Sequence, residues 1–105
     1  MQEYEVKRGY TADLQTKMVQ ELRDYFNTEP QESGGHYRIQ YGALRKLEVW
    51  VGKSGKSIVI DTEANPEASD EEIIDTNQRF RRYLDTVTGF TTKERVKRAK
   101  KAAEG

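Results

Sequence analysis

The sequence predicts an α+β fold in two layers, in which an antiparallel four-stranded sheet carries two long helices on one face. Three observations predict this fold. Four short stretches alternate apolar and polar side chains with the two-residue period of strands. Two longer stretches repeat apolar side chains at helical spacing, and the connections in the middle of the chain are short enough for hairpins. The expected order is β-α-β-β-β-α-α, and the last helix is short and basic.

The totals favour one folded domain with no cofactor. A chain of 105 residues suits a single domain, and its 34% hydrophobic residues imply a lean core under a heavily charged surface. The chain has no cysteine and one histidine, which excludes disulfides, thiolate metal sites and multi-histidine metal sites. No apolar run is long enough to span a membrane, and the first residues do not resemble a signal peptide. We therefore expect a cytoplasmic protein without membrane contacts.

A strand and a helix open the chain. Apolar and charged side chains alternate over residues 3–8, which predicts a strand. An amphipathic helix follows as far as about residue 27, and Thr11 or Asp13 can cap its N-terminus. Its apolar side chains recur every four residues, at Leu14, Met18, Leu22 and Phe26. A loop over residues 30–35, which contains a proline and two glycines, ends this part of the chain.

Three strands connected by hairpins follow, over residues 37–41, 46–52 and 57–63. Their alternation places Leu47 and Val49 on one face of the sheet and Trp50 on the other, with Val59 as the expected neighbour of Trp50. Such a pattern is typical of a sheet with one covered and one open face. The indole of Trp50 is then on the open side.

A capping box marks the start of the second long helix. Its two members are Ser69 and Glu72, and Gly89 suits the left-handed residue that ends such a helix. The expected apolar stripe consists of Ile73, Ile74, Asn77, Phe80, Tyr83, Leu84 and Val87.

A basic tail follows this helix. Thr91 and Glu94 form a second capping box, which opens a helix with too few apolar residues to dock firmly. We therefore expect a domain over residues 1–90 and a basic helical tail over residues 91–105. The tail holds six basic and two acidic residues, so its net charge is +4. The candidate contacts to the phosphates of RNA or DNA are Lys93, Arg95, Lys97, Arg98, Lys100 and Lys101.

Three other patterns have simpler structural explanations. Gly52–Ser57 contains the Gly-Lys-Ser of a phosphate-binding loop, but a strand rather than a helix is expected next, so we predict a hairpin turn. His36 has no visible orienting partner, so we predict a solvent-facing loop histidine. The carboxylates of residues 70–75 lie where negative charge favours a helix start. The sequence therefore shows no catalytic constellation, and we do not expect an enzyme.

Three segments carry a resemblance to a known family. They are Glu5–Gly9, Tyr41–Leu44 and Thr88–Arg95. With these segments the chain resembles small archaeal proteins, frequent in methanogens, that are catalogued as a domain of unknown function. The resemblance implies a single small domain without an assigned activity, so it brings no catalytic residues. The order of elements is also similar to one half of the TATA-binding-protein fold, with one strand fewer, although a fold does not determine function.

Trp50 is the main candidate for binding. Exposed aromatic area on a small protein can belong to an interaction surface, and Lys7, Arg38 and Val59 can surround it. Three hypotheses stay open. The face can pair with a second copy of the chain, it can stack on single-stranded RNA, or the last helix or Phe90 can cover it.

We therefore expect a non-catalytic binding module that self-associates, or binds a protein partner, through the open face of its sheet. The alternative is a nucleic-acid-binding accessory protein that uses the basic tail. The net negative charge of the rest of the chain opposes this alternative.

Overall fold

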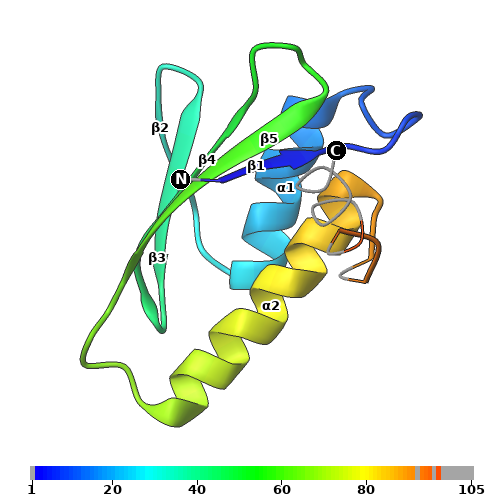
Figure 1. The fold of residues 1–105 in the computed structure, drawn as a ribbon. Coiled ribbons are helices and arrows are strands. Elements are labelled where there is room, and N and C mark those ends of the chain that lie inside the picture. Colours follow the sequence, from blue (N-terminus) through cyan, green and yellow to red (C-terminus); the bar gives the residue numbers. More distant parts are fainter. Residues whose placement is uncertain (1, 92, 96, 98–105) are drawn as a thin grey trace.

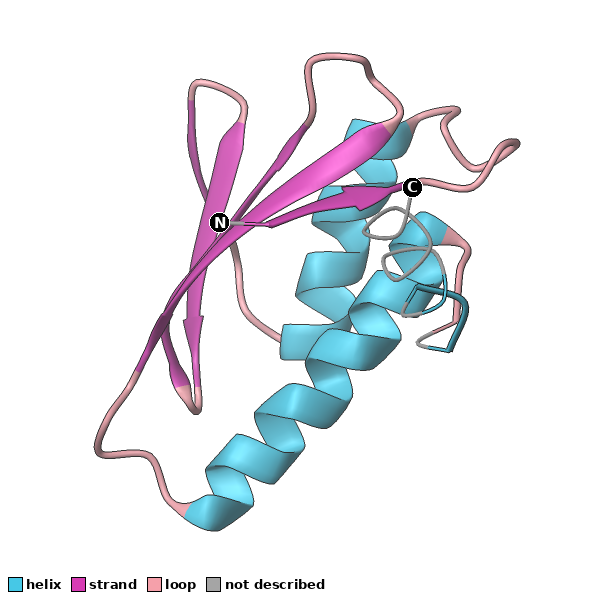
Figure 2. Ribbon diagram, viewed as in Figure 1, coloured by secondary structure: helices cyan, strands magenta, loops and turns pink. Residues whose placement is uncertain are grey.

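A computed structural model describes residues 2–91, 93–95 and 97 of the chain. It has two layers, a five-stranded antiparallel sheet and a pair of helices packed on one of its faces (Figure 1). The elements are β1 (Gln2–Glu5), α1 (Leu14–Phe26), β2 (Gln31–Ser33), β3 (His36–Tyr41), β4 (Leu44–Val51), β5 (Ser57–Ala64) and α2 (Asp70–Thr88). The predicted α+β class and the placement of both helices on one face are confirmed (Figure 2).

The sheet has a fifth strand that the sequence did not predict. Its order is β1-β5-β4-β3-β2, so the first strand of the chain lies at one edge and the short β2 at the other. Ser33 pairs with His36 across a turn in which Gly34 and Gly35 both have positive φ, as a two-residue hairpin requires. The three residues of β2 are polar and exposed, so they carry no alternation that sequence analysis could detect.

The core lies between the sheet and the two helices. The stripe predicted for α1 is buried throughout, and it packs with a sheet face whose centre is formed by Leu47, Val49 and Ile58. Tyr83 on α2 is completely buried, and its hydroxyl donates a hydrogen bond to the carbonyl of Met18 on α1 at 3.0 Å. This burial raises the pKa of the Tyr83 hydroxyl, so the group stays neutral and joins the two helices.

The first turns of α2 correct the predicted stripe. Ile73 and Ile74 are 41% and 58% exposed rather than buried, because this part of the helix extends past the β3–β4 hairpin (Figure 1). Thr76 takes the inward position instead, and its hydroxyl accepts a hydrogen bond from the backbone of Ala43 at 3.0 Å. Apolar periodicity in the sequence does not reveal a threonine that is buried because it accepts a hydrogen bond from the backbone of a turn.

The predicted caps are confirmed for α2 and only in part for α1. Ser69 forms the capping box of α2, and Gly89 ends that helix with a φ of 77°. Asp13 occupies the N-cap position of α1, but its side chain makes no capping hydrogen bond. Thr91 forms the second predicted capping box, since its hydroxyl accepts a hydrogen bond from the amide of Glu94 at 3.2 Å. Among the described residues, no helix combines the length and the apolar character needed to cross a membrane.

Candidate interaction face around Trp50

The face of the sheet opposite the helices carries Trp50. It lies on β4, whose residues Leu47 and Val49 are fully buried on the helix side, so the alternation of the strand turns Glu48 and Trp50 away from the helices. The register pairs Trp50 with Val59 of β5, as the sequence predicted. Both helices lie on the other side of the sheet (Figure 2).

Trp50 is stacked on an imidazole. The rings of His36 and Trp50 are parallel within 6°, and their centroids are 4.1 Å apart. His36 is the first residue of β3 and is only partly exposed, so the prediction of a solvent-facing loop histidine was wrong. The register explains the contact, because the pairing of Tyr37 with Val49 brings His36 opposite Trp50.

Glu48 orients the imidazole. Its Oε2 lies 2.9 Å from Nδ1 of His36, and its Oε1 lies 3.3 Å from Nη2 of Arg38. The hydrogen bond from His36, with a smaller contribution from Arg38, holds the pKa of Glu48 below its usual value. Because an ionised carboxylate only accepts hydrogen bonds, we assign the hydrogen to Nδ1 of His36. The imidazole is thus held at its ring face by Trp50 and at one nitrogen by Glu48.

The other cations of this face are also paired with carboxylates. Lys46 lies 2.9 Å from Asp61, and Arg45 lies 2.8 Å from Glu63. The hydrogen bond from Lys46 lowers the pKa of Asp61, so both partners of that pair are charged at neutral pH. The face around Trp50 therefore presents charges of both signs and is not a basic platform.

Lys7 does not belong to this face. The backbone of Val6 and Lys7 lies beyond the end of β1, and the amide of Lys7 donates a hydrogen bond to the carbonyl of Thr88 on α2 at 2.7 Å. The residue of β1 that pairs with Val59 is Glu3. Of the predicted neighbours, the structure thus brings Arg38 and Val59 to Trp50 and places Lys7 elsewhere.

Sequence reasoning left His36 out of the face and gave Glu48 no role in it. A usable signal was present, because His36 lies two residues before Arg38 and Glu48 lies two residues before Trp50, which puts each pair on one side of its strand. The sequence did not show the pairing of the two strands, so it could not show that the imidazole meets the indole.

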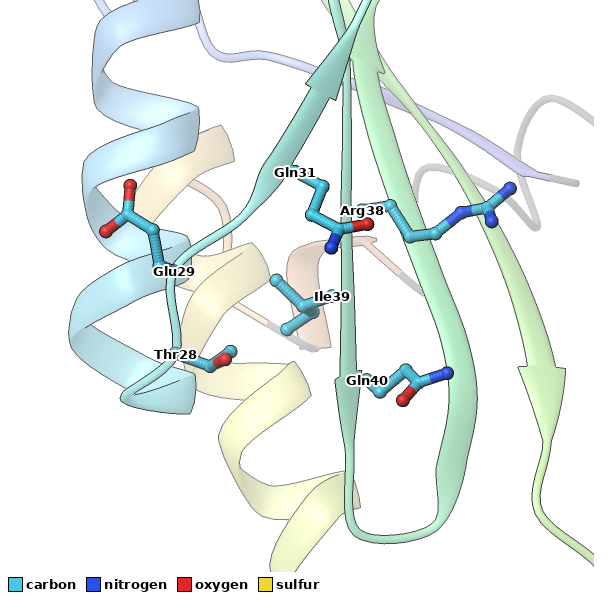
Figure 3. A pocket seen from close by; sticks show the side chains of 6 residues that line it. All are labelled: Thr28, Glu29, Gln31, Arg38, Ile39 and Gln40. Atoms are coloured by element: carbon cyan, nitrogen blue, oxygen red, sulfur yellow. The ribbon is translucent and has the colours of Figure 1, made fainter.

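Two shallow polar hollows adjoin the face at the edge formed by β2 and β3. One, of about 340 Å³, is lined by Thr28, Glu29, Gln31, Arg38, Ile39 and Gln40 (Figure 3). The other, of about 310 Å³, is lined by Gln31, Glu32, Ser33, His36, Arg38 and Glu48. The first lies where β2 begins, because Gln31 is the first residue of β2 and pairs with Arg38. Arg38 borders both hollows.

The predicted contacts of the basic tail divide into three groups. Lys93 and Lys97 are exposed, whereas the side chain of Arg95 is only 11% exposed. Its guanidinium donates to Asp85 at 2.5 Å and to the carbonyl of Phe90 at 2.7 Å, so Arg95 holds the start of the tail against α2. The other candidates, Arg98, Lys100 and Lys101, lie outside the described residues. The described part of the tail and the buried Phe90 lie at the end of α2 (Figure 1).

The Gly-Lys-Ser segment forms the predicted hairpin turn. The amide of Gly52 donates to the carbonyl of Ser57 at 2.8 Å, and β5 follows at once. An alanine at Gly52 would displace neighbouring side chains, because its Cβ would lie 2.1 Å from the Ser57 hydroxyl and 2.7 Å from the Glu3 carboxylate. The segment therefore joins β4 to β5 and lacks the helix of a phosphate-binding loop.

Comparison with known proteins gives a family and no activity. A family model described as a domain of unknown function (DUF5611) matches residues 1–101. No curated protein and no solved structure matches the chain. The match covers nearly the whole chain and includes the basic residues of the tail as far as Lys101. The chain therefore belongs to the family described as a domain of unknown function (DUF5611), in agreement with the resemblance of its three sequence segments.

Proposed function

We propose that this domain is a non-catalytic interaction module that binds protein through the open face of its sheet, with a second copy of the chain as its partner. The observation that carries the proposal is the stacked pair of Trp50 and His36 on a face that neither α1 nor α2 covers. Tryptophan is strongly enriched among the residues that dominate binding energy at protein interfaces. The stack presents that indole in a fixed orientation, which reduces the entropy lost on binding.

The surroundings of the stack are those of an interface rim. Val59 extends the apolar area on one side, and the ion pairs of Arg38 with Glu48 and of Lys46 with Asp61 flank it. A surface with charges of both signs can meet a symmetry-related copy of itself without net repulsion. Arg38, Arg45 and Lys46 are already bonded to carboxylates, and this argues against binding of single-stranded RNA to this face.

The histidine supports binding better than catalysis. His36 has an orienting carboxylate in Glu48, which is one requirement for a general base. The only hydroxyl paired with it across the hairpin belongs to Ser33, and within the described part of the chain no hydrogen bond joins that hydroxyl to the imidazole. A stacked, bonded imidazole beside a shallow hollow instead supplies a directed polar contact next to the indole.

Sedimentation velocity over a wide range of protein concentration tests the proposal. We expect the wild-type chain to form dimers as concentration rises, and Trp50→Ala to shift this association to at least tenfold higher concentration. Ile74→Ala is the matched control, because Ile74 is an apolar residue that is 58% exposed and lies on α2, away from this face. A wild-type chain that remains monomeric at all concentrations, or equal behaviour of the two variants, would overturn self-association through this face.

A further inference from the structure

Cations without acidic partners gather at one end of the molecule. The exposed cations that form no ion pair within residues 2–91, 93–95 and 97 are Lys7, Arg8, Lys53, Lys56, Arg81, Arg82, Lys93 and Lys97. Arg81 and Arg82 lie on α2. The other six come from three segments that are far apart in the sequence, namely the loop after β1, the β4–β5 hairpin and the start of the tail. Figure 1 shows these segments at the end of the molecule where α2 terminates.

Backbone hydrogen bonds hold the three segments together. The amide of Val6 donates to the carbonyl of Lys56 at 2.9 Å, which joins the loop to the hairpin. The amide of Lys7 donates to the carbonyl of Thr88 at 2.7 Å, which joins the same loop to the end of α2. Arg95 then fixes the tail to that helix end through Asp85. The cations therefore belong to one surface and not to three independent loops.

The loop is also fastened by an aromatic contact. Tyr10 packs so closely on Gly89 that a Cβ there would lie 2.9 Å from the tyrosine ring. Lys17 places its ammonium group 4.5 Å from the centre of the same ring. Tyr10 thus keeps Lys7 and Arg8 near the end of α2.

The remaining charges show that this clustering is a property of one end. Cations elsewhere on the molecule are mostly neutralised, as in the pairs of Arg23 with Glu29 and of Arg79 with Asp75. The opposite end of α2 carries exposed carboxylates, which are those of Glu67, Asp70, Glu71 and Glu72. The formal net charge of zero therefore conceals a separation of charge along the molecule.

We infer that this basic end, defined by Lys7, Arg8, Lys53, Lys56, Lys93 and Lys97, binds the phosphate backbone of a nucleic acid. Solvation of a helix terminus does not account for the cluster, because Lys53 and Lys56 belong to a hairpin and the effect of a helix dipole is confined to its last turn. Several cations spread over one surface suit the regular charge of a phosphate backbone.

The alternative of an anionic membrane fits the surface less well. A basic surface that binds a bilayer usually carries apolar side chains that insert beside the cations. The exposed isoleucines Ile73 and Ile74 lie at the opposite end of α2, and Tyr10, which is 40% exposed at this end, is held against Gly89 and Lys17. This inference is independent of the face around Trp50, and it adds Lys7, Arg8, Lys53 and Lys56 to the residues that the tail alone suggested.

Fluorescence anisotropy with labelled mixed-sequence RNA and DNA, single-stranded and duplex, tests the inference at 50 and 200 mM NaCl. We expect binding at 50 mM NaCl that weakens steeply at 200 mM. The variant Lys53→Gln/Lys56→Gln should bind about tenfold or more weakly, and its log–log salt slope should be smaller by about 2. Arg23→Gln/Arg45→Gln is the matched control, because it removes the same charge from exposed residues outside this end.

Each remaining outcome counts against the inference. Absence of binding to all probes at 50 mM NaCl overturns it. If Lys53→Gln/Lys56→Gln binds as tightly as the wild type, the binding belongs to the tail alone, and the composite surface is overturned. Equal losses in the two double variants show an effect of net charge without a located site. Binding to phosphatidylserine vesicles but to no nucleic acid assigns the surface to membranes. Trp50→Ala should retain nucleic-acid binding, which separates this test from that of the interaction face.

Discussion

The imidazole of His36 lies parallel to the indole of Trp50, with ring centroids 4.1 Å apart. Two neighbouring strands bring the rings together, and Glu48 fixes the imidazole from the side. The stack is thus a joint product of strand pairing and a side-chain hydrogen bond. It contributes both to the stability of the sheet and to the shape of the open face.

Removal of the imidazole should therefore destabilise the fold. We expect His36→Ala to lower the free energy of unfolding by about 1–2 kcal/mol, through loss of the stack and of a hydrogen bond to a charged group. Urea denaturation followed by fluorescence measures this directly, because Trp50 is the only tryptophan. Arg38→Ala should cost only about 0.5 kcal/mol, since its ion pair is longer and exposed. Equal losses would show that the stack adds nothing to stability.

Acid should weaken the fold through Glu48. Its pKa is lowered in the folded state by the hydrogen bond from His36, so its contribution to stability is complete above the ordinary value of 4.5 and disappears as pH falls through the folded pKa. Asp61 and Asp75, whose pKa values are lowered by Lys46 and Tyr41, add to the same trend. The free energy of unfolding should therefore decrease from pH 5 to pH 3.

Glu48→Gln isolates this contribution. The variant should be less stable than the wild type at pH 7, and the difference in unfolding free energy should shrink as pH approaches 3. Urea titrations of both chains at pH 7, 5 and 3 give the comparison. A difference that stays constant over this range would mean that the carboxylate charge has no role in the stability of the face.

Gly42 should be more sensitive to substitution than Gly34. It has a φ of 47°, and a Cβ there would lie 2.5 Å from the hydroxyl of Thr76. Gly34 has a φ of 57° and open space, so Gly34→Ala reports the backbone cost alone. We expect Gly42→Ala to cost about 1–3 kcal/mol more than Gly34→Ala, by thermal or urea denaturation.

A second substitution tests the cause of that difference. In a Thr76→Ala background the hydroxyl is gone, so the additional cost of Gly42→Ala should become smaller. An unchanged cost in this background would assign the whole effect to backbone conformation.

The two ends of α2 should respond differently to substitution. Ile74→Lys should change the free energy of unfolding by no more than about 0.5 kcal/mol, because Ile74 is 58% exposed. Leu84→Ala, which empties a buried position, should cost about 2–5 kcal/mol. Urea denaturation of both variants provides the measurement. A large loss for Ile74→Lys would mean that the first turns of α2 are packed.

The sequence was most informative where periodicity is regular. The stripe of α1 and the alternation of β4 are determined by burial on one side, and both were predicted correctly. The three polar residues of β2 carry no such pattern, because an edge strand is held by backbone hydrogen bonds. The start of α2 was misjudged for the opposite reason, since Ile73 and Ile74 continue an apolar pattern past the end of the sheet that would cover them.

The candidate surfaces were predicted only as far as single strands and segments allow. Trp50, Val59 and Arg38 follow from the alternation within each strand. Which residues meet across strands depends on register, and so the contacts of His36 and Glu48 came from the structure. The loop of Lys7 and the hairpin of Lys56 are separated by about half of the chain, and only the tertiary fold brings them together.

The opposed charges at the two ends of α2 make the protein an electric dipole. At low ionic strength, the carboxylates around Asp70 in one molecule attract the lysines around Lys56 in another, which favours head-to-tail chains without a closed symmetry. At about 0.1 M salt the screening length is about 10 Å, and this attraction fades. Head-to-tail polymers would therefore dissociate when salt is added. Dimers formed through the face around Trp50 would persist, because they use a different part of the molecule.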